Sequence, residues 1–123
     1  MSAEAARRAI EIFFEGFNGE DDARIHEALN FPHVRIASGT VRVIEGPGHF
    51  KTPFDGLKRI EGWHHSTLDR SDVIHEGENK VHFDVAFTRF REDGTAYATH
   101  QAVWVVTRVD GHWGIQARSS FAP

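Results

Sequence analysis

The residues most able to do chemistry in this chain are its histidines, nine among 123 residues. An imidazole titrates near neutral pH, so a histidine in a pocket can donate or accept a proton during a reaction. One occurs in an alternating run near the carboxyl end, at His100, and two occur together in the stretch Trp63-His64-His65-Ser66. We predict His100 and His65 as catalytic residues, which requires both to face a pocket.

Other kinds of catalytic site are excluded or disfavoured by what the sequence lacks. The chain contains no cysteine, so it has no disulfides, thiolate nucleophiles or thiolate zinc ligands. It has no HExxH motif, and adjacent residues of a strand point to opposite faces, so the histidine pair cannot chelate one ion. A Gly-rich phosphate loop and a Gly-x-Ser-x-Gly elbow are also missing. We therefore expect no metal and no cofactor.

The charge and hydropathy of the chain argue against two classes of partner. The net charge is −4 with acidic and basic residues interleaved, and no basic patch predicts nucleic-acid binding. No segment approaches the roughly 20 apolar residues of a membrane span, and the N-terminus lacks the pattern of a secretory signal. We expect one domain over residues 1–123, located in the cytoplasm, without a nucleic-acid or membrane partner.

Three helices are expected in the first half of the chain. Residues 3–17 place apolar side chains at spacings of three and four, which is typical of a helix with one apolar face. A shorter helix is predicted over about residues 20–29, because Pro32 follows and disfavours further helical turns. A third helix is predicted at about residues 54–61, after Pro53.

The remaining segments are expected to form strands. Valine and isoleucine alternate with other residues on both sides of residues 38–40, which predicts a short hairpin. Two of the later connections, Asp93-Gly94 and Asp110-Gly111, are strong signals for two-residue turns. The longer alternating runs lie at about residues 64–76, 80–91, 96–109 and 112–121.

The Asp-Gly turns also predict which residues share a face of the sheet. A two-residue turn pairs the residues that flank it, so we expect Phe87 opposite His100 and Ala102 opposite Ser119. The face that contains these residues is otherwise apolar, and it is the predicted core face. A polar side chain on such a face is costly unless it is satisfied. His100, Ser119 and, near the rim, Arg89 are therefore candidate functional residues.

The same alternation assigns the other residues near the carboxyl end. Phe121 is expected on the core face, two residues after Ser119. Arg118 is expected on the opposite face, where an ion pair with Asp84 or a contact across a dimer would give it a structural role.

The orientation of the histidine pair depends on the connection at residues 77–79. If three residues form this loop, His65, Asp69 and Val73 face inward, and we favour this alternative, with Asp69 as the partner of His65. If two residues form the loop, the inward residues are instead His64, Arg70, Asp72 and Ile74.

The order of the predicted elements resembles that of a known superfamily. Two N-terminal helices, a hairpin, a third helix and strands ending in AVWVVTRVDGHWGIQARSSFAP are similar to the NTF2-like superfamily, most closely at residues 80–83, 110–113 and 118–121. These segments look like those of uncharacterised bacterial members, and the resemblance covers nearly the whole chain. It implies an α+β, cone-shaped fold, in which a strongly curved antiparallel sheet packs on three N-terminal helices. It also implies an apolar pocket at the open end and, usually, a dimer.

Members of this superfamily differ in their catalytic residues. Ketosteroid isomerases use an aspartate early in the first strand and a tyrosine on the first helix. The nearest first-strand positions here are Ala37 and Ser38, and the first helix contains no tyrosine, so steroid isomerisation by that mechanism is disfavoured. Dehydratase-type members use histidines with an acid in the cone, a pattern that His65 and His100 approach.

Two functions are consistent with these residues. The first is a cofactor-independent dehydratase, cyclase or isomerase that acts on an apolar carbonyl or ring metabolite by histidine general acid–base chemistry. The second is a non-catalytic module of the NTF2-like fold, for binding a small ligand or for homodimeric interaction. We expect a small apolar molecule as ligand and a homodimer. The predicted substrate-binding residues are Ser119, Arg89, Phe87, Phe121, Phe14 and Trp63.

Overall fold

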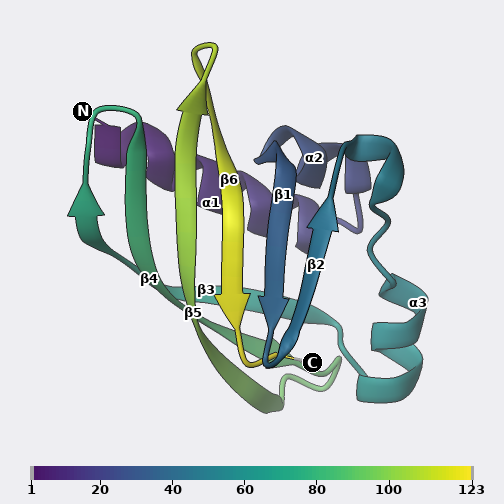
Figure 1. The fold of residues 1–123 in the computed structure, drawn as a ribbon. Coiled ribbons are helices and arrows are strands. Elements are labelled where there is room, and N and C mark those ends of the chain that lie inside the picture. Colours follow the sequence, from purple (N-terminus) through teal and green to yellow (C-terminus); the bar gives the residue numbers. More distant parts are fainter. Residues whose placement is uncertain (1, 123) are drawn as a thin grey trace.

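A long N-terminal helix lies across one face of a curved, open sheet (Figure 1). The computed structural model describes residues 2 to 122 of the chain. The helix, α1 (Ser2–Asn18), has apolar residues at every third or fourth position, as predicted. Its buried side includes Ile10, Phe13 and Phe14, which pack on the sheet.

The second helix, α2 (Asp22–Glu27), is shorter than predicted. It begins where the Asp21 carboxylate accepts a hydrogen bond from the backbone N–H of Arg24, at 3.2 Å. It ends before the predicted residue 29, because Leu29 already belongs to the first strand.

The third helical segment lies in the connection between the two edges of the sheet. After a single 3-10 turn, η1 (Pro47–His49), α3 (Phe54–Gly56) continues directly into a π-helical turn, η2 (Leu57–Glu61). Helical backbone therefore covers residues 54–61, as predicted. No helix among the described residues is long and apolar enough to cross a membrane.

Six strands form one sheet in the order β2-β1-β6-β5-β4-β3. The α+β class and the curved sheet are confirmed, but the sheet is not wholly antiparallel, because β1 and β6 run parallel. This pair arises because residues 45–64 carry the chain from the β2 edge to the opposite edge, which leaves β1 beside the last strand (Figure 1). The strands are β1 (Leu29–Ala37), β2 (Thr40–Ile44), β3 (His65–Glu76), β4 (Lys80–Phe90), β5 (Ala96–Val109) and β6 (His112–Ser120).

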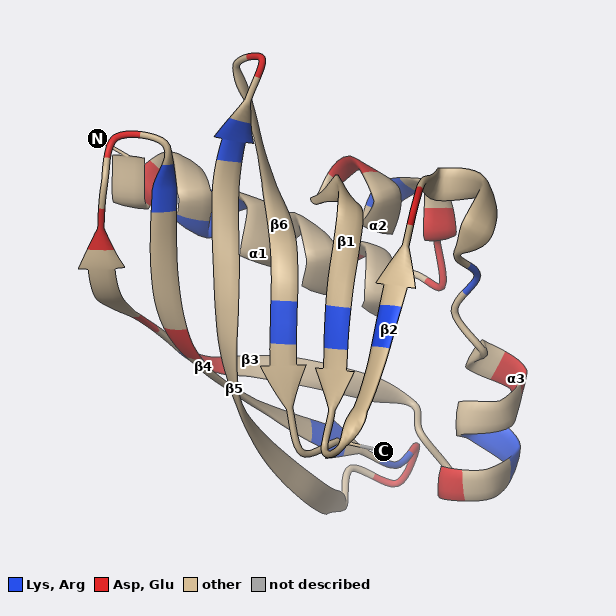
Figure 2. Ribbon diagram, in the orientation of Figure 1, with Lys and Arg blue, Asp and Glu red and all other residues tan. Residues whose placement is uncertain are grey.

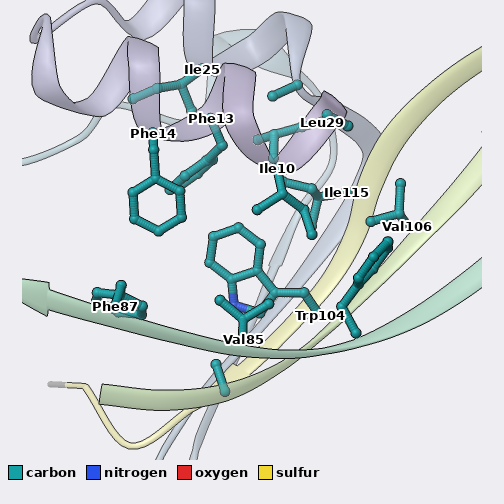
Figure 3. Packing of buried hydrophobic residues seen from close by; sticks show 14 of the residues in the cluster. Ile10, Phe13, Phe14, Ile25, Leu29, Val85, Phe87, Trp104, Val106 and Ile115 are labelled. Carbon is teal, nitrogen blue, oxygen red and sulfur yellow. The ribbon is translucent and has the colours of Figure 1, made fainter. Parts of the chain in front are cut away.

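The core lies between α1 and the concave face of the sheet. Figure 3 shows Phe13 and Phe14 pointing from α1 toward Trp104 of β5. The Phe14 and Trp104 rings are stacked, with centroids 5.6 Å apart and planes 4° from parallel. Burial of each such aromatic side chain stabilises the fold by about 1.5–3 kcal/mol. The helix is therefore held to the sheet mainly by these rings.

The pairing of β4 with β5 follows the prediction from the Asp93-Gly94 turn. Phe87 lies opposite His100, and Phe83 lies opposite Trp104. The ladder shifts only at its end, beyond Arg89. His100 and Arg89 are therefore on the inner face, as predicted.

The pairing of β5 with β6 departs from the prediction after its first four pairs. Val106 lies opposite Ile115 as expected, but the next pair is Val105 with Ala117, so Gln116 is an extra residue that forms a β-bulge. The Gln116 amide donates a hydrogen bond to the Pro32 carbonyl. The bulge therefore occurs where β6 contacts the start of β1.

A one-residue shift reverses the face of every later side chain in β6. Trp104 now lies opposite Arg118, and Ala102 lies opposite Ser120 instead of Ser119. The prediction that Arg118 faces outward is wrong, and so is the prediction that Ser119 faces the core. Ser119 is exposed on the outer face, opposite Val103.

Phe121 also differs from the prediction. Its side chain is 78% exposed, because β6 ends at Ser120 and the chain no longer follows the strand alternation. Ala122, only 2% exposed, packs against the core instead.

The close approach of β6 to β1 depends on Gly114. A Cβ atom on this residue would lie 2.6 Å from the carbonyl carbon of Leu29 and 2.7 Å from the backbone nitrogen of Asn30. Both are main-chain atoms, which cannot move without displacing β1.

We predict that Gly114→Ala lowers the free energy of unfolding by about 1–3 kcal/mol, because the added methyl group forces the two strands apart. Gly39→Ala is the control, since a Cβ there meets no atom within 4 Å. It should change stability by no more than about 0.5 kcal/mol. Urea unfolding followed by circular dichroism measures both, and equal stabilities of the two variants would contradict the assigned contact.

Candidate functional site

Two adjoining cavities lie beneath the carboxyl-terminal half of α1. The inner cavity has a volume of about 440 Å³ including its mouth, and the outer cavity about 610 Å³. The inner cavity is lined by Phe13, Phe14, Phe17, Arg35, Ser66, Phe87, Arg89, Trp104, Arg118, Ser120 and Ala122. The outer cavity is lined by Phe13, Phe17, Arg35, Arg42, Phe50, Lys51, Thr52, Pro53, Leu57, Arg89 and Arg118.

Aromatic rings form the apolar wall of the inner cavity. The ring of Phe14 lies against both Trp104 and Phe87, the latter at 5.7 Å between centroids. The Phe13 ring meets Trp104 edge to face at 5.1 Å. Such a wall is suited to the flat face of an apolar molecule.

Three arginines on adjacent strands form a row in the sheet beside this aromatic wall, where Arg118 is paired with Trp104. Arg42 of β2 pairs with Arg35 of β1, which in turn pairs with Arg118 of β6. In Figure 2, basic segments lie side by side on β2, β1 and β6. We call Arg42, Arg35 and Arg118 the arginine row. Like charges placed directly opposite each other destabilise a sheet, so the row has an electrostatic cost.

Arg118 is the innermost member of the arginine row. Its guanidinium carbon lies 4.8 Å from the centroid of the Phe13 ring and 5.8 Å from that of Trp104. Burial, together with the charge of Arg35, lowers the pKa of Arg118 to about 9. Arg118 remains charged at neutral pH, and its charge lies against aromatic faces.

His33 of β1 holds Arg118 in place. The ring of His33 is fully buried, and its Nδ1–H donates to the Ile115 carbonyl at 2.8 Å. Its Nε2 accepts a hydrogen bond from Nε of Arg118 at 2.9 Å. Because an arginine nitrogen can only donate, His33 must be neutral with its proton on Nδ1. Burial and then the charge of Arg118 lower the pKa of His33 to about 3.

Arg35 adds a second positive charge, half-buried, to the same wall. Burial lowers its pKa, and the neighbouring charges of Arg89 and Arg42 lower it further. The pKa values of Arg35 and Arg118 are therefore both lowered by other cations as well as by burial. Both side chains line the inner and the outer cavity.

Arg89 has a different environment at the rim. It is 7% exposed and forms an ion pair with Glu61 of η2 at 3.1 Å, and Tyr97 also donates to this carboxylate at 2.8 Å. Burial and the Glu61 carboxylate raise the pKa of Tyr97 to about 12. His100 belongs to this group: burial and then the charge of Arg89 lower its pKa, against a smaller effect of Glu61.

The sequence-predicted residues divide between the cavity and its surroundings. Phe14, Phe87 and Arg89 line the inner cavity. His100 packs beside Phe87 at 5.4 Å between ring centroids, but it is not among the described lining residues. Trp63 is buried behind the wall, where its indole N–H donates to the hydroxyl of Ser66 at 2.9 Å.

His65 is turned away from the inner cavity. Ser66 lines that cavity, so its neighbour on the strand, His65, points to the other face, where it stacks on Phe90 at 4.8 Å. The other histidine of the pair, His64, is exposed and lies with its Nδ1 3.0 Å from that of His65.

Neither predicted orientation of β3 holds along the whole strand, because the strand contains two register shifts. One shift lies between Leu68 and Arg70 and the other between Val73 and His75. The skipped residue in the first is Asp69, which is exposed and accepts a hydrogen bond from Thr67 at 2.7 Å. It is therefore not a partner of His65 in a cavity.

The site residues that sequence reasoning missed are His33, Ser120 and the arginine row. Arg35 and Arg42 share one face in the alternating pattern of the hairpin, but the pattern alone does not distinguish a solvent-exposed face of the sheet from a cavity wall. No turn, glycine or proline marks the bulge at Gln116, so the orientation of Arg118 had no sequence signal.

A structure from Shewanella oneidensis, described as an NTF-2-like protein of unknown function, superposes with a TM-score of 0.76 at 13% identity and covers 98% of each chain. The chain has the NTF2-like fold. An NTF2-like protein from Novosphingobium aromaticivorans with a cystatin-like fold also gives a TM-score of 0.76, at 17% identity, over 97% of this chain and 80% of that one.

A third structural neighbour is a ketosteroid isomerase-like protein from Erwinia carotovora atroseptica. Its TM-score is 0.67 at 14% identity, over 99% of this chain and 98% of that one. At such identities the likeness concerns the fold alone. No family model and no curated protein matches the sequence.

We predict that His33 makes the fold sensitive to acid. Its pKa is about 6.5 when unfolded and about 3 when folded, so the unfolded chain binds the extra proton. Its contribution to stability is complete above about pH 6.5 and is lost as the pH falls toward 3. His33→Gln, whose amide oxygen can still accept from Arg118, should remove this dependence.

Urea unfolding measured between about pH 6.5 and 4 tests the role of His33. The wild type should lose up to about 1.4 kcal/mol per pH unit more than His33→Gln. Parallel pH profiles for the two proteins would show that the ring is not buried in its neutral form.

Proposed function

We propose that the protein binds a small molecule with a flat apolar body in the inner cavity. The observation that carries this proposal is the cavity itself, whose lining combines stacked aromatic rings with the polar residues Arg118, Ser66 and Ser120. An apolar wall with a few positioned polar groups is the usual character of a small-ligand site.

Binding is better supported than proton transfer at the predicted histidines. His65 faces away from the cavity, and His100 lies behind Phe87 at the rim. A general acid or base must reach the reacting atom within hydrogen-bond distance. A catalytic role for His100, and with it a dehydratase, cyclase or isomerase activity, stays a prediction.

Two serines of β6 give a matched test of the cavity. Ser120 lines the inner cavity, whereas Ser119, next in the chain, is exposed on the outer face. Ser120→Phe fills the cavity, so it should weaken the binding of every ligand at least about tenfold. Ser119→Phe should bind within about twofold of the wild type.

Isothermal titration calorimetry with a panel of aromatic acids and their amides provides the measurement. The panel consists of benzoate, phenylacetate, 3-phenylpropionate, 2-naphthoate and the corresponding neutral amides. Both variants are compared at a concentration where they sediment as the wild type does. If no member of the panel binds the wild type, or if Ser119→Phe blocks binding and Ser120→Phe does not, the proposal is wrong.

We also propose that the chain forms a homodimer through the outer face of the sheet. Val41 and Val43 of β2 are 63% and 52% exposed, and Val103 of β5 is 45% exposed. These residues are connected across β1 and β6, where Val34 lies beside both Val43 and Ala117. A connected patch of exposed aliphatic side chains is typical of an interaction surface.

Sedimentation equilibrium tests the dimer. The wild type should have about twice the chain mass of 13.9 kDa. Val103→Asp places a charge in the proposed interface and should shift the mass toward the monomer. Ile60→Asp is the control, because Ile60 is 79% exposed but lies on η2, away from the patch. A wild-type monomer at micromolar concentration would exclude the interface.

A further inference from the structure

We propose that the ligand is a small organic anion, whose acidic group is bound by Arg118 of the arginine row while its flat body lies in the inner cavity. This inference rests on the proposed function and names the chemical class of its ligand. It differs from the neutral apolar molecule expected from the sequence.

The first observation is the imbalance of charge around the two cavities. Their described lining residues include five cationic side chains and no aspartate or glutamate. The nearest carboxylate in the rim group, Glu61, is already bound to Arg89 and Tyr97. Arg118 forms no ion pair among the described residues. The five cationic residues are Arg35, Arg42, Lys51, Arg89 and Arg118. Arg89 is paired with Glu61 and Arg35 has an interaction of its own, so the unmatched charge on these walls is that of Arg118. Burial of a cation without an anion is costly, and a bound anion would offset that cost.

The second observation is the orientation of Arg118. His33 takes the hydrogen bond of Nε, and Phe13 and Trp104 lie against the guanidinium. The two terminal nitrogens form no hydrogen bond with the described residues, and they can bind both oxygens of a carboxylate in parallel. Because His33 and the rings fix the side chain, little conformational entropy is lost when it binds.

The third observation is that the cations stand at the junction of the two cavities. Arg35, Arg89 and Arg118 line both cavities, whereas Phe14, Phe87 and Trp104 line only the inner one. Arg42 and Lys51 line only the outer one. A ligand with one apolar end and one acidic end matches this division, with its acidic group directed toward the outer cavity.

Two buried donors on these walls also lack protein partners. The hydroxyl of Thr52, in the outer cavity, is buried without a hydrogen bond, and so is Nε of Arg89. Thr52 is 6% exposed. Buried donors are normally satisfied, so polar atoms of a ligand or water are expected at both positions.

The decisive comparison is between an acid and its amide with the same body. For the wild type, we expect 3-phenylpropionate to bind at least about tenfold more tightly than 3-phenylpropanamide in calorimetric titration. Arg118→Gln should reduce this preference to about twofold or less and leave the affinity for the amide unchanged. Arg108→Gln, which removes an equal charge from an exposed position on β5, should keep the full preference.

Arg42→Gln is a second test variant, to be used if Arg118→Gln does not fold. Arg42 is exposed, so its replacement should leave the fold intact while lowering the preference for the acid by about twofold to threefold. Inorganic phosphate is titrated alone to separate a simple anion site from one that also needs an apolar body.

Each outcome is decisive for one of the two proposals. If the amide binds as tightly as the acid, or if Arg108→Gln lowers the preference as much as Arg118→Gln, the anion inference is wrong but the binding cavity stands. If inorganic phosphate binds as tightly as 3-phenylpropionate, the apolar body has no role and the inference is wrong in that part. If neither the acids nor the amides bind, the proposed function itself fails.

Discussion

The parallel pairing of β1 with β6 is the constraint on which the site depends. It sets Arg35 beside Arg118, and it brings the ring of His33 to the carbonyl of Ile115. The same contact is close enough to exclude any side chain at Gly114. Were the two strands separated, the arginine row would lose its middle member and Arg118 would lose its hydrogen bond to His33. Fold and site are thus held by the same strand contact.

The electrostatics of the interior contrast with those of the whole chain. The net charge is −4, yet β2, β1 and β6 carry a row of basic residues side by side (Figure 2), and these residues line the outer cavity. Such an arrangement is unfavourable for folding, since buried like charges repel one another. The aromatic rings around Arg118 and the neutral ring of His33 reduce that cost. A polar interior that costs stability is a common property of binding sites.

Much of the fold could be predicted from the sequence, because local patterns determine it. The spacing of apolar residues was enough to predict α1. The Asp-Gly turns were enough to predict the two hairpins that they close and the pairing of Phe87 with His100. Register beyond a bulge could not be predicted, since an extra residue has no local signature. For this reason Phe87 and Arg89 lie on the predicted face, whereas Ser119 was assigned to the wrong face. Phe121 was also misplaced, because the end of β6 at Ser120 has no local signature either.

The bulge at Gln116 has a consequence for how this fold can change its ligand. Upstream of it, β6 keeps the register set by its turn, and downstream every side chain is exchanged between the two faces. Loss of that one residue would turn Arg118 outward and bring Ser119 into the cavity, with no other change in composition. A single-codon deletion is therefore enough to remove the innermost cation of the pocket, so the ligand preference can change with almost no change in sequence identity among proteins that share this architecture.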